Sequence, residues 1–122
     1  MRSYPEQALQ VAVADYLRLV LPPTVFWSAV GHGGGGRVRG AILKAMGLRA
    51  GVPDLFLIHG GRAYFIELKT PTGRISTAQM VAHDAIERAG ATVAICRSVD
   101  AVADQLRRWV IKTREVSYGH TR

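Results

Sequence analysis

Residues 51–69 have the sequence GVPDLFLIHGGRAYFIELK, and this stretch decides the fold. Two runs rich in β-branched and aromatic residues, Asp54–His59 and Arg62–Lys69, are typical of strands. The pair Gly60-Gly61 between them is a two-residue connection of the kind that favours a tight hairpin. The sequence therefore predicts two antiparallel strands joined at this turn.

Helical and strand-like patterns flank the hairpin on both sides. The expected elements are a helix from Pro5 to Val20, a strand at Thr24–Val30, a short helix at Ala41–Met46, a helix capped by Ser76 or Thr77 and closed by Gly90, a buried strand at Ala91–Cys96 and a last helix from Ser98 or Asp100. The expected apolar faces of the last two helices are Met80, Ala82, Ile86 and Ala89, and then Val102, Leu106, Trp109 and Val110. This order, α-β-(α)-β-β-α-β-α, predicts an α/β fold with a mixed sheet of about four strands flanked by helices.

The length of 122 residues predicts one domain over 1–122, with a core at about 5–112 and a C-terminal tail at about 113–122. The single cysteine, Cys96, excludes a disulfide framework and a zinc site built on several thiolates. No apolar run approaches the roughly 20 residues that cross a bilayer, and no signal-peptide pattern follows Met1. We therefore expect a cytoplasmic protein without a membrane partner.

The charge points to a polyanionic partner. The chain has 16 Lys and Arg against 9 Asp and Glu, a formal net charge of +7. A strongly basic domain is typical of nucleic-acid binders, although a bias toward arginine also arises from genome composition. Basicity alone leaves nucleic acid, an anionic membrane surface and an acidic protein open as partners.

Two acidic residues of the hairpin are expected to face each other. Asp54 and Glu67 each lie six residues outside the glycine pair, so antiparallel pairing places them opposite one another. Their side chains then stand about 5 Å apart, and Lys69 lies on the same face as Glu67. Paired carboxylates favour Mg²⁺ or Mn²⁺, which can activate water at a phosphodiester. Lys69 can stabilise developing charge or help to position the attacking water.

A purely structural interpretation stays open at this point. Glu67 and Lys69 can belong to a solvated strand face, and Asp54 can be a turn residue after Pro53. Against this interpretation, the strand around Glu67 is otherwise apolar, so that charges there are costly unless they are paired.

The same residues resemble a known nuclease signature, the PD-(D/E)XK motif, and within that superfamily the virus-type replication-repair nuclease (VRR-NUC) family. The motifs that carry the resemblance are KAMG at 44–47, GVPDL at 51–55, IELKTP at 66–71, GRIS at 73–76, Gln79 and Gly90. The resemblance implies a restriction-endonuclease-like core and a Mg²⁺-dependent DNA endonuclease, with Mn²⁺ as a substitute ion and no small-molecule cofactor. Stand-alone members are similar to Holliday-junction resolvases that act as homodimers on branched DNA.

Individual roles follow from the resemblance, position by position. Asp54 and Glu67 would ligate the metal, with the Leu68 carbonyl as a third ligand, and Lys69 would be the catalytic lysine. Gln79 would support the attacking water or the phosphate. Glu6 matches an acidic residue that many members add to the metal site, although an acid in the first turn of a helix is also favoured by the helix dipole.

Contacts with the DNA backbone are expected from basic residues around the glycine-rich segment and after the second strand of the hairpin: Arg37, Arg39, Lys44, Arg49 and Arg74. His32, within the glycine-rich segment, is a weaker candidate for the same role. The last helix, with Trp109 and Val110, or the first helix is expected to supply the dimer contact.

Two other functions remain compatible with the sequence. One is a non-catalytic nucleic-acid-binding module that kept the fold and its basic surface. The other is a restriction-type, sequence-specific endonuclease with the same metal site, although no element for reading bases stands out in so short a chain.

Overall fold

The computed structural model describes residues 5–31 and 36–114. The helices and strands are α1 (Pro5–Val20), β1 (Phe26–Ala29), α2 (Gly36–Ala45), β2 (Leu55–His59), β3 (Arg62–Leu68), α3 (Thr77–Arg88), β4 (Thr92–Cys96) and α4 (Val99–Arg108). The order agrees with the one expected from the sequence. The expected tail from residue 113 stays a prediction, because residues 115–122 lie outside the described part of the chain.

The sheet has four strands in the order β1-β2-β3-β4. β1, β2 and β3 are antiparallel neighbours, whereas β4 runs parallel to β3 after the crossover through α3. Both glycines of the β2–β3 turn have positive φ, +59° for Gly60 and +77° for Gly61, which is the geometry of the two-residue hairpin predicted above. The sheet is therefore mixed, as expected.

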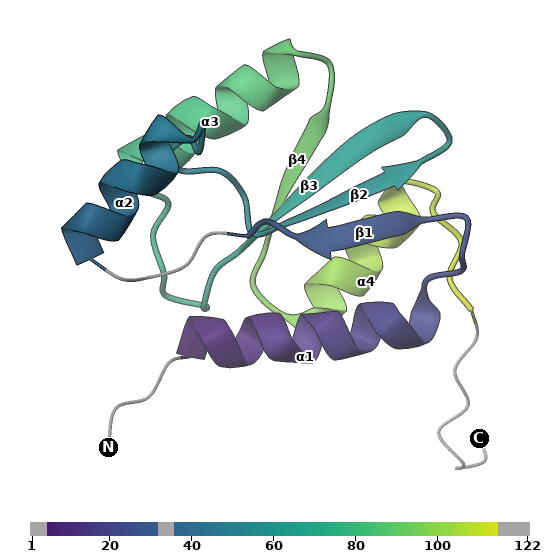
Figure 1. Ribbon diagram of the computed structural model, residues 1–122. Helices are drawn as coiled ribbons and strands as arrows, with labels where there is room; N and C mark the ends of the chain where they lie inside the picture. Colours follow the sequence, from purple (N-terminus) through teal and green to yellow (C-terminus); the bar gives the residue numbers. More distant parts are fainter. Residues whose placement is uncertain (1–4, 32–35, 115–122) are drawn as a thin grey trace.

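Helices pack on both faces of the sheet (Figure 1). On one face, α1 and α4 bury the alternate residues of β2 and β3 and form the main core with Val13, Leu17, Leu55, Leu57, Ile66, Leu68, Val102 and Leu106. On the other face, α3 packs against β4 and buries Ala82. In the described chain, α2 packs against no other helix or strand.

Capping residues fix the ends of α3 and α4. Ser76 accepts the backbone N–H of Gln79, and the Gln79 side chain accepts the backbone N–H of Ser76, so that the two form a capping box. Ser98 accepts the N–H of Ala101 at the start of α4. Of the two alternatives considered at each helix, the serine is the cap.

Four sequence-based expectations about burial are wrong. Met80 is exposed, because it lies two residues, about 200° of helical rotation, from the buried Ala82. Ala89 is exposed at the C-cap, beyond the last residue of α3. Val110 has a positive φ of 59° beyond the end of α4 and points outward, while Ile111 is buried in its place. β4 is not buried throughout: only Cys96 among its described residues is buried, and Ile95 is exposed on the face that α3 partly covers.

The chain leaves the sheet after Val30 and returns to it at Asp54. The N–H of Val30 donates to the carbonyl of Asp54 over 2.9 Å, which continues the β1–β2 pairing by one step. Within this excursion, α2 begins at Gly36, five residues earlier than the predicted Ala41, and Gly47 with φ +108° follows it. No helix in the described chain is long and apolar enough to span a membrane.

Candidate active site

The β2–β3 register brings Asp54 and Glu67 together. Leu55 pairs with Ile66, so the next step outward from the turn opposes Asp54 and Glu67, as the spacing from the glycine pair predicts. The N–H of Leu68 donates to Asp54 Oδ2 over 2.7 Å, which fixes the aspartate against β3. In an extended strand the carbonyl of a residue points to the same edge as its N–H. The Leu68 carbonyl therefore lies on the Asp54 side of β3.

Glu67 is a buried acid. Its exposed fraction is 2%, and its pKa is raised from 4.5 to about 8, with burial as the largest cause. The charge of Asp54 and a hydrogen bond between the two carboxyl groups contribute to this rise, while the Lys69 ammonium group opposes it. A buried carboxyl group whose pKa is raised by a neighbouring carboxylate forms with it a site that favours a cation.

Helix α3 holds both oxygens of Glu67. Gln79 Nε2 donates to Glu67 Oε2 over 3.1 Å, and His83 Nε2 lies 3.0 Å from Glu67 Oε1. Burial lowers the pKa of His83, so its neutral form is favoured. His83 was not predicted from the sequence as a site residue. Its position four residues after Gln79, on the same helix face, is the signal that identifies it.

Lys69 is buried next to Glu67, and its charge acts on both Glu67 and His83. Its backbone N–H donates to the carbonyl of Cys96, which extends the parallel β3–β4 pairing to the end of the site. The structure thus places the predicted lysine beside the two carboxylates, at the end of a well-anchored strand.

Arg97 fixes the segment that follows Lys69. Its Nη1 donates to the carbonyls of Thr70 and Gly73, each over 2.7 Å. These contacts hold the turn between β3 and the cap of α3. The turn therefore links Lys69 on one side to Gln79 on the other.

Two cavities open onto the carboxylates and share Glu6 and Asp54 in their walls. The smaller, of about 340 Å³, is lined by residues of 48–54 together with Glu6, Glu67 and Gln79. The larger, of about 660 Å³, lies between the start of α1 and the end of β3, where Leu68 and Thr70 border it. Glu6 is thus in the wall of the site and also raises the pKa of Glu67.

Within the described residues, no group of three or more His, Cys, Asp or Glu side chains stands close enough together to hold a metal ion by itself. The carboxylate pair with the Leu68 carbonyl is the donor set that the structure offers. A direct role for Glu6 as a ligand stays a prediction.

Gly51 lets the 48–54 segment approach α3 closely. Its φ is +83°, and a Cβ added there would overlap the backbone of Ala78 and Gln79. This contact sets the wall of the smaller cavity against the first turn of α3, where Gln79 lies.

The predicted DNA-contacting residues lie at different distances from this site. Arg49 lines the smaller cavity, and with Lys44 it also lines a neighbouring cavity of about 540 Å³ between the end of α2 and α3. Arg37 and Arg39 are exposed on α2, and Arg74 is exposed in the turn before α3. His32 lies outside the described residues. Arg49 is therefore the predicted basic residue that borders the carboxylates directly.

A family model, the VRR-NUC domain, matches residues 6–100, which include every residue of the site described above. The chain belongs to the VRR-NUC family. Its membership agrees with the resemblance found in the sequence and gives the protein a nuclease-type fold.

Two solved structures share the VRR-NUC fold with this chain. One, described as a "VRR_NUC domain protein", has a TM-score of 0.67 and 18% identity and covers 90% of this chain and 91% of its own. A second, described as a "VRR_NUC domain", has a TM-score of 0.57 and 21% identity, with coverage of 87% and 97%. Among curated proteins no match is found.

Proposed function

We propose that this VRR-NUC domain is a metal-dependent, structure-selective DNA endonuclease that hydrolyses phosphodiester bonds in branched DNA. The observation that carries the proposal is the contact of the half-buried Asp54 with the buried Glu67, with Lys69 buried beside Glu67. Acids buried in contact are costly to ionise unless a cation joins them. A structural role alone does not account for that arrangement at the wall of an open cavity.

The donor set fits Mg²⁺, with Mn²⁺ as a substitute. Two carboxylates and the Leu68 carbonyl provide hard oxygen ligands, and Mg²⁺ in proteins keeps several waters and takes substrate phosphate oxygens for the rest. When bound, the ion would supply an activated water and neutralise negative charge on the phosphodiester.

The protein's own residues then have separate tasks. Lys69 presents an ammonium group beside the carboxylates, where it stabilises charge that develops on the phosphate. Gln79 and His83 hold the orientation of Glu67 from α3. Arg49 borders the same cavity and is placed to contact a phosphate next to the one that is cut.

A homodimer suits a four-way junction as substrate. A two-fold dimer presents two equivalent sites to two strands related by the same symmetry. The net charge of +7 per chain favours a large polyanion as the partner. We therefore propose a Holliday-junction resolvase-like activity within the broader nuclease assignment.

The test is a cleavage panel with labelled four-way junction, flap, splayed-arm and linear duplex DNA in Mg²⁺, Mn²⁺, Ca²⁺ or EDTA. We expect the wild type to cut the junction in Mg²⁺ or Mn²⁺ and to be inactive in EDTA. Glu67→Gln keeps the shape of the side chain and removes its charge, so cleavage should fall by at least about 10²-fold while junction binding persists. Asp84→Asn changes an exposed acid on the same helix as Gln79 and serves as the matched control.

Three results would contradict the proposal in different ways. Binding without cleavage by the wild type under every metal condition would indicate a non-catalytic module. Cutting confined to one sequence of linear duplex would indicate a restriction-type enzyme. Equal cleavage by wild type and Glu67→Gln would remove the carboxylate pair from the mechanism.

A further inference from the structure

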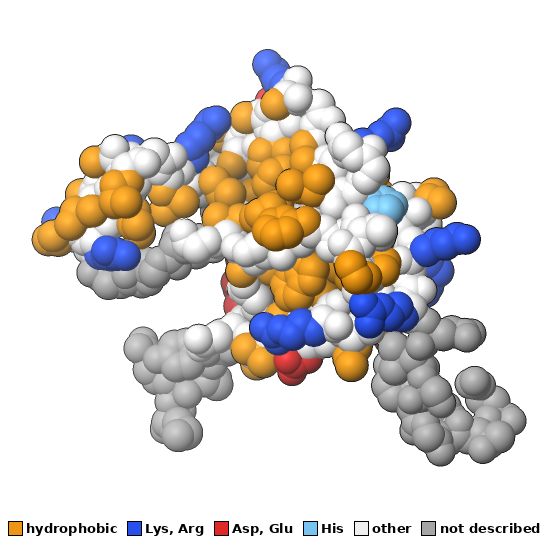
Figure 2. Space-filling view, turned by 45° about the vertical axis from the view of Figure 1, so that its right-hand side comes forward, with side chains coloured by type: hydrophobic (Ala, Val, Ile, Leu, Met, Phe, Trp, Pro, Cys, Tyr) orange, Lys and Arg blue, Asp and Glu red, His pale blue; other side chains and the backbone are white. Residues whose placement is uncertain are grey.

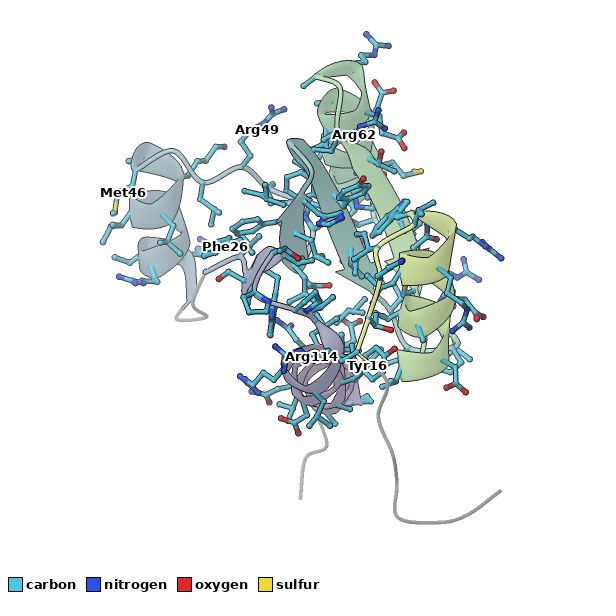
Figure 3. The ribbon with its side chains drawn as sticks, turned by 90° about the vertical axis from the view of Figure 1, so that its right-hand side faces the viewer. Tyr16, Phe26, Met46, Arg49, Arg62 and Arg114 are labelled. Atoms are coloured by element: carbon cyan, nitrogen blue, oxygen red, sulfur yellow. The ribbon has the colours of Figure 1, made fainter. Side chains whose placement is uncertain are left out.

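Helix α2 carries its apolar stripe on the side that faces solvent. Val38, Ile42 and Met46 recur every four residues and have exposed fractions between 46% and 77%. Met46 continues the last turn, since its N–H donates to the carbonyl of Ile42. Figure 3 shows Met46 pointing away from the sheet, and within the described chain α2 packs against no other element. The stripe has no partner in the chain.

A ten-residue helix of this composition is not stable by itself in water. Isolated helices shorter than about 12 residues are marginal even when they are rich in alanine. Gly40, in its interior, weakens this one further by up to about 1 kcal/mol relative to alanine. Packing of the Val38–Ile42–Met46 stripe against another surface is therefore needed to keep α2 folded.

The sheet offers a matching apolar surface that no helix covers. Phe26, Phe56, Ile58 and Phe65 share the face on which α3 covers only the β4 side, and their register places them side by side. Phe26 and Ile58 oppose each other and are 61% and 44% exposed. The ring centres of Phe56 lie 5.9 Å from Phe26 and 6.4 Å from Phe65. Figure 2 shows hydrophobic side chains gathered in the middle of the view, and a second group on α2 at the left edge.

We propose that α2 of one copy packs its Val38–Ile42–Met46 stripe on the Phe26–Phe56–Ile58–Phe65 surface of a second copy, and that the exchange is reciprocal. In the described part of each chain α2 has no surface to pack on, and the Phe26–Phe56–Ile58–Phe65 surface has no helix packed on it. A two-fold pair covers both apolar surfaces at once. The inference rests on the proposed function in one respect: it supplies the interface of the homodimer proposed there.

Area and charge favour a second copy as the occupant. At their exposed fractions, the five side chains Val38, Ile42, Met46, Phe26 and Ile58 present on the order of 500 Å² per copy, so a pair removes on the order of 1,000 Å² from water, where specific interfaces begin. The sheet surface carries no charged side chain, so that two copies of net charge +7 meet there without like charges in contact. A nucleic acid offers no comparable apolar surface to the stripe.

The pairing also leaves Arg37 and Lys44 of α2 free, whereas Arg39 lies about 60° around the helix from Ile42, at the edge of the stripe. At 100° per residue, Arg37 and Lys44 lie about 140° to 160° around the helix from Ile42. When the stripe is covered, these two side chains point away from the interface. They remain available to phosphates of a bound nucleic acid.

The sequence-based expectation placed the dimer contact on the last or the first helix. The Trp109 ring, however, packs on Tyr64 of its own chain with ring centres 4.7 Å apart. In α1, the residues Val13, Leu17 and Val20 are buried in the core of their own chain. The exchange of α2 is the alternative that uses surfaces left open in the chain.

The first experiment measures mass by light scattering at micromolar concentration without DNA. We expect the wild type at about twice the 13.3 kDa of one chain and Ile42→Glu and Ile58→Glu at the mass of one chain. Leu19→Glu, at a position on α1 that is 57% exposed, is the matched control and should stay dimeric. A monomeric wild type, or dimeric Ile42→Glu and Ile58→Glu, overturns the proposal.

The second experiment locates the contact without disturbing the fold. Ile42→Cys protein and Ile58→Cys protein are mixed and oxidised, and a disulfide-linked pair of unlike chains is expected. The native Cys96 does not interfere, because it is buried and burial raises the pKa of its thiol to about 11. Linkage of Ile42→Cys protein to itself alone would mean that α2 packs on α2, and it overturns the proposed exchange.

Neither readout depends on cleavage, so the two proposals fail separately. A cross-linked dimer that cuts no DNA would leave the interface in place and remove the nuclease assignment. A monomer that cuts junctions would do the reverse.

Discussion

Gln79 Nε2 donates a hydrogen bond to Glu67 Oε2 over 3.1 Å, while Oε1 of the same side chain accepts the backbone N–H of Ser76. One amide group thus completes the N-terminal cap of α3 and orients the buried Glu67 of β3. Because the amide has both a donor and an acceptor, a single residue can do both. The N-terminal cap of α3 and the orientation of Glu67 therefore depend on the same side chain.

Substitutions at Gln79 should separate these two tasks. Gln79→Glu keeps an acceptor for Ser76 but places a carboxylate against Glu67, so stability should change by less than about 1 kcal/mol while cleavage falls strongly. Ser76→Ala removes the cap without touching Glu67 and should cost about 1 kcal/mol with cleavage largely retained. Urea unfolding and junction cleavage measure the two effects. Normal cleavage by Gln79→Glu would contradict the role of the Gln79–Glu67 contact.

The raised pKa of Glu67 makes metal-free stability depend on pH. The folded protein retains a proton on Glu67 up to about pH 8, whereas the unfolded chain releases it near pH 4.5. Between these values the folded state binds more protons, so the free energy of unfolding should decrease as the pH rises from about 5 to 8. Thermal unfolding in EDTA across this range measures the slope. Glu67→Gln, which does not titrate, should flatten it, and an unchanged slope would contradict the assignment.

A divalent cation should stabilise the folded protein at neutral pH. An ion that binds only the folded state adds about 2.7 kcal/mol when its concentration is 100 times its dissociation constant. Ca²⁺ allows this to be measured as a rise in melting temperature with no need for cleavage. Asp54→Asn should abolish the rise, and Asp84→Asn, an exposed acid paired with Arg88, should retain it.

Gly51→Ala should disturb both stability and the site. The added Cβ overlaps the backbone at Ala78, and a φ of +83° is unfavourable for alanine, so we expect a loss of more than about 2 kcal/mol. Gly40→Ala is the control, because its Cβ meets nothing within 4 Å and alanine favours a helix by about 1 kcal/mol. Chemical unfolding of both variants gives the comparison. A Gly51→Ala protein as stable as wild type would mean that this close approach is not needed.

Arg97→Ala should loosen the turn between Lys69 and α3. Its two 2.7 Å hydrogen bonds to the carbonyls of Thr70 and Gly73 are lost, and hydrogen exchange in residues 70–76 should accelerate. Cleavage should fall several-fold, because Lys69 and Gln79 flank this turn. Arg88→Ala, which breaks an exposed ion pair with Asp84, should leave both measurements unchanged. Unaltered exchange in Arg97→Ala would show that other contacts hold the turn.

Local patterns predicted the hairpin and its acid pair because the two-glycine turn fixes the register of everything that follows it. Once Gly60 and Gly61 form the turn, counting six residues outward on each strand identifies Asp54 and Glu67 as opposed residues. The strand alternation then places Lys69 beside Glu67 without further information. These features depend on separations of a few residues.

The rest depends on how distant elements pack, which no short pattern contains. His83 contacts Glu67 only because the crossover brings α3 over the end of β3. The exposure of Phe26 and Ile58 follows from the absence of a helix over the β1–β2 side of one face in the described chain. The prediction that Val110 is buried extends the helical pattern beyond the end of α4. The φ of 59° at Val110 is not helical, so the pattern does not hold there.

The hydrogen bond between Val30 and Asp54 closes the sheet beneath the excursion of residues 31–53. This hydrogen bond holds Asp54 in place at the start of β2, whichever residues connect it to Val30. Residues 36–47 can accordingly be shortened, enlarged or exchanged, as in loop grafting, while residues 48–52, which line the smaller cavity, are kept. The proposed dimer contact of α2 is in this way physically separate from the carboxylate pair.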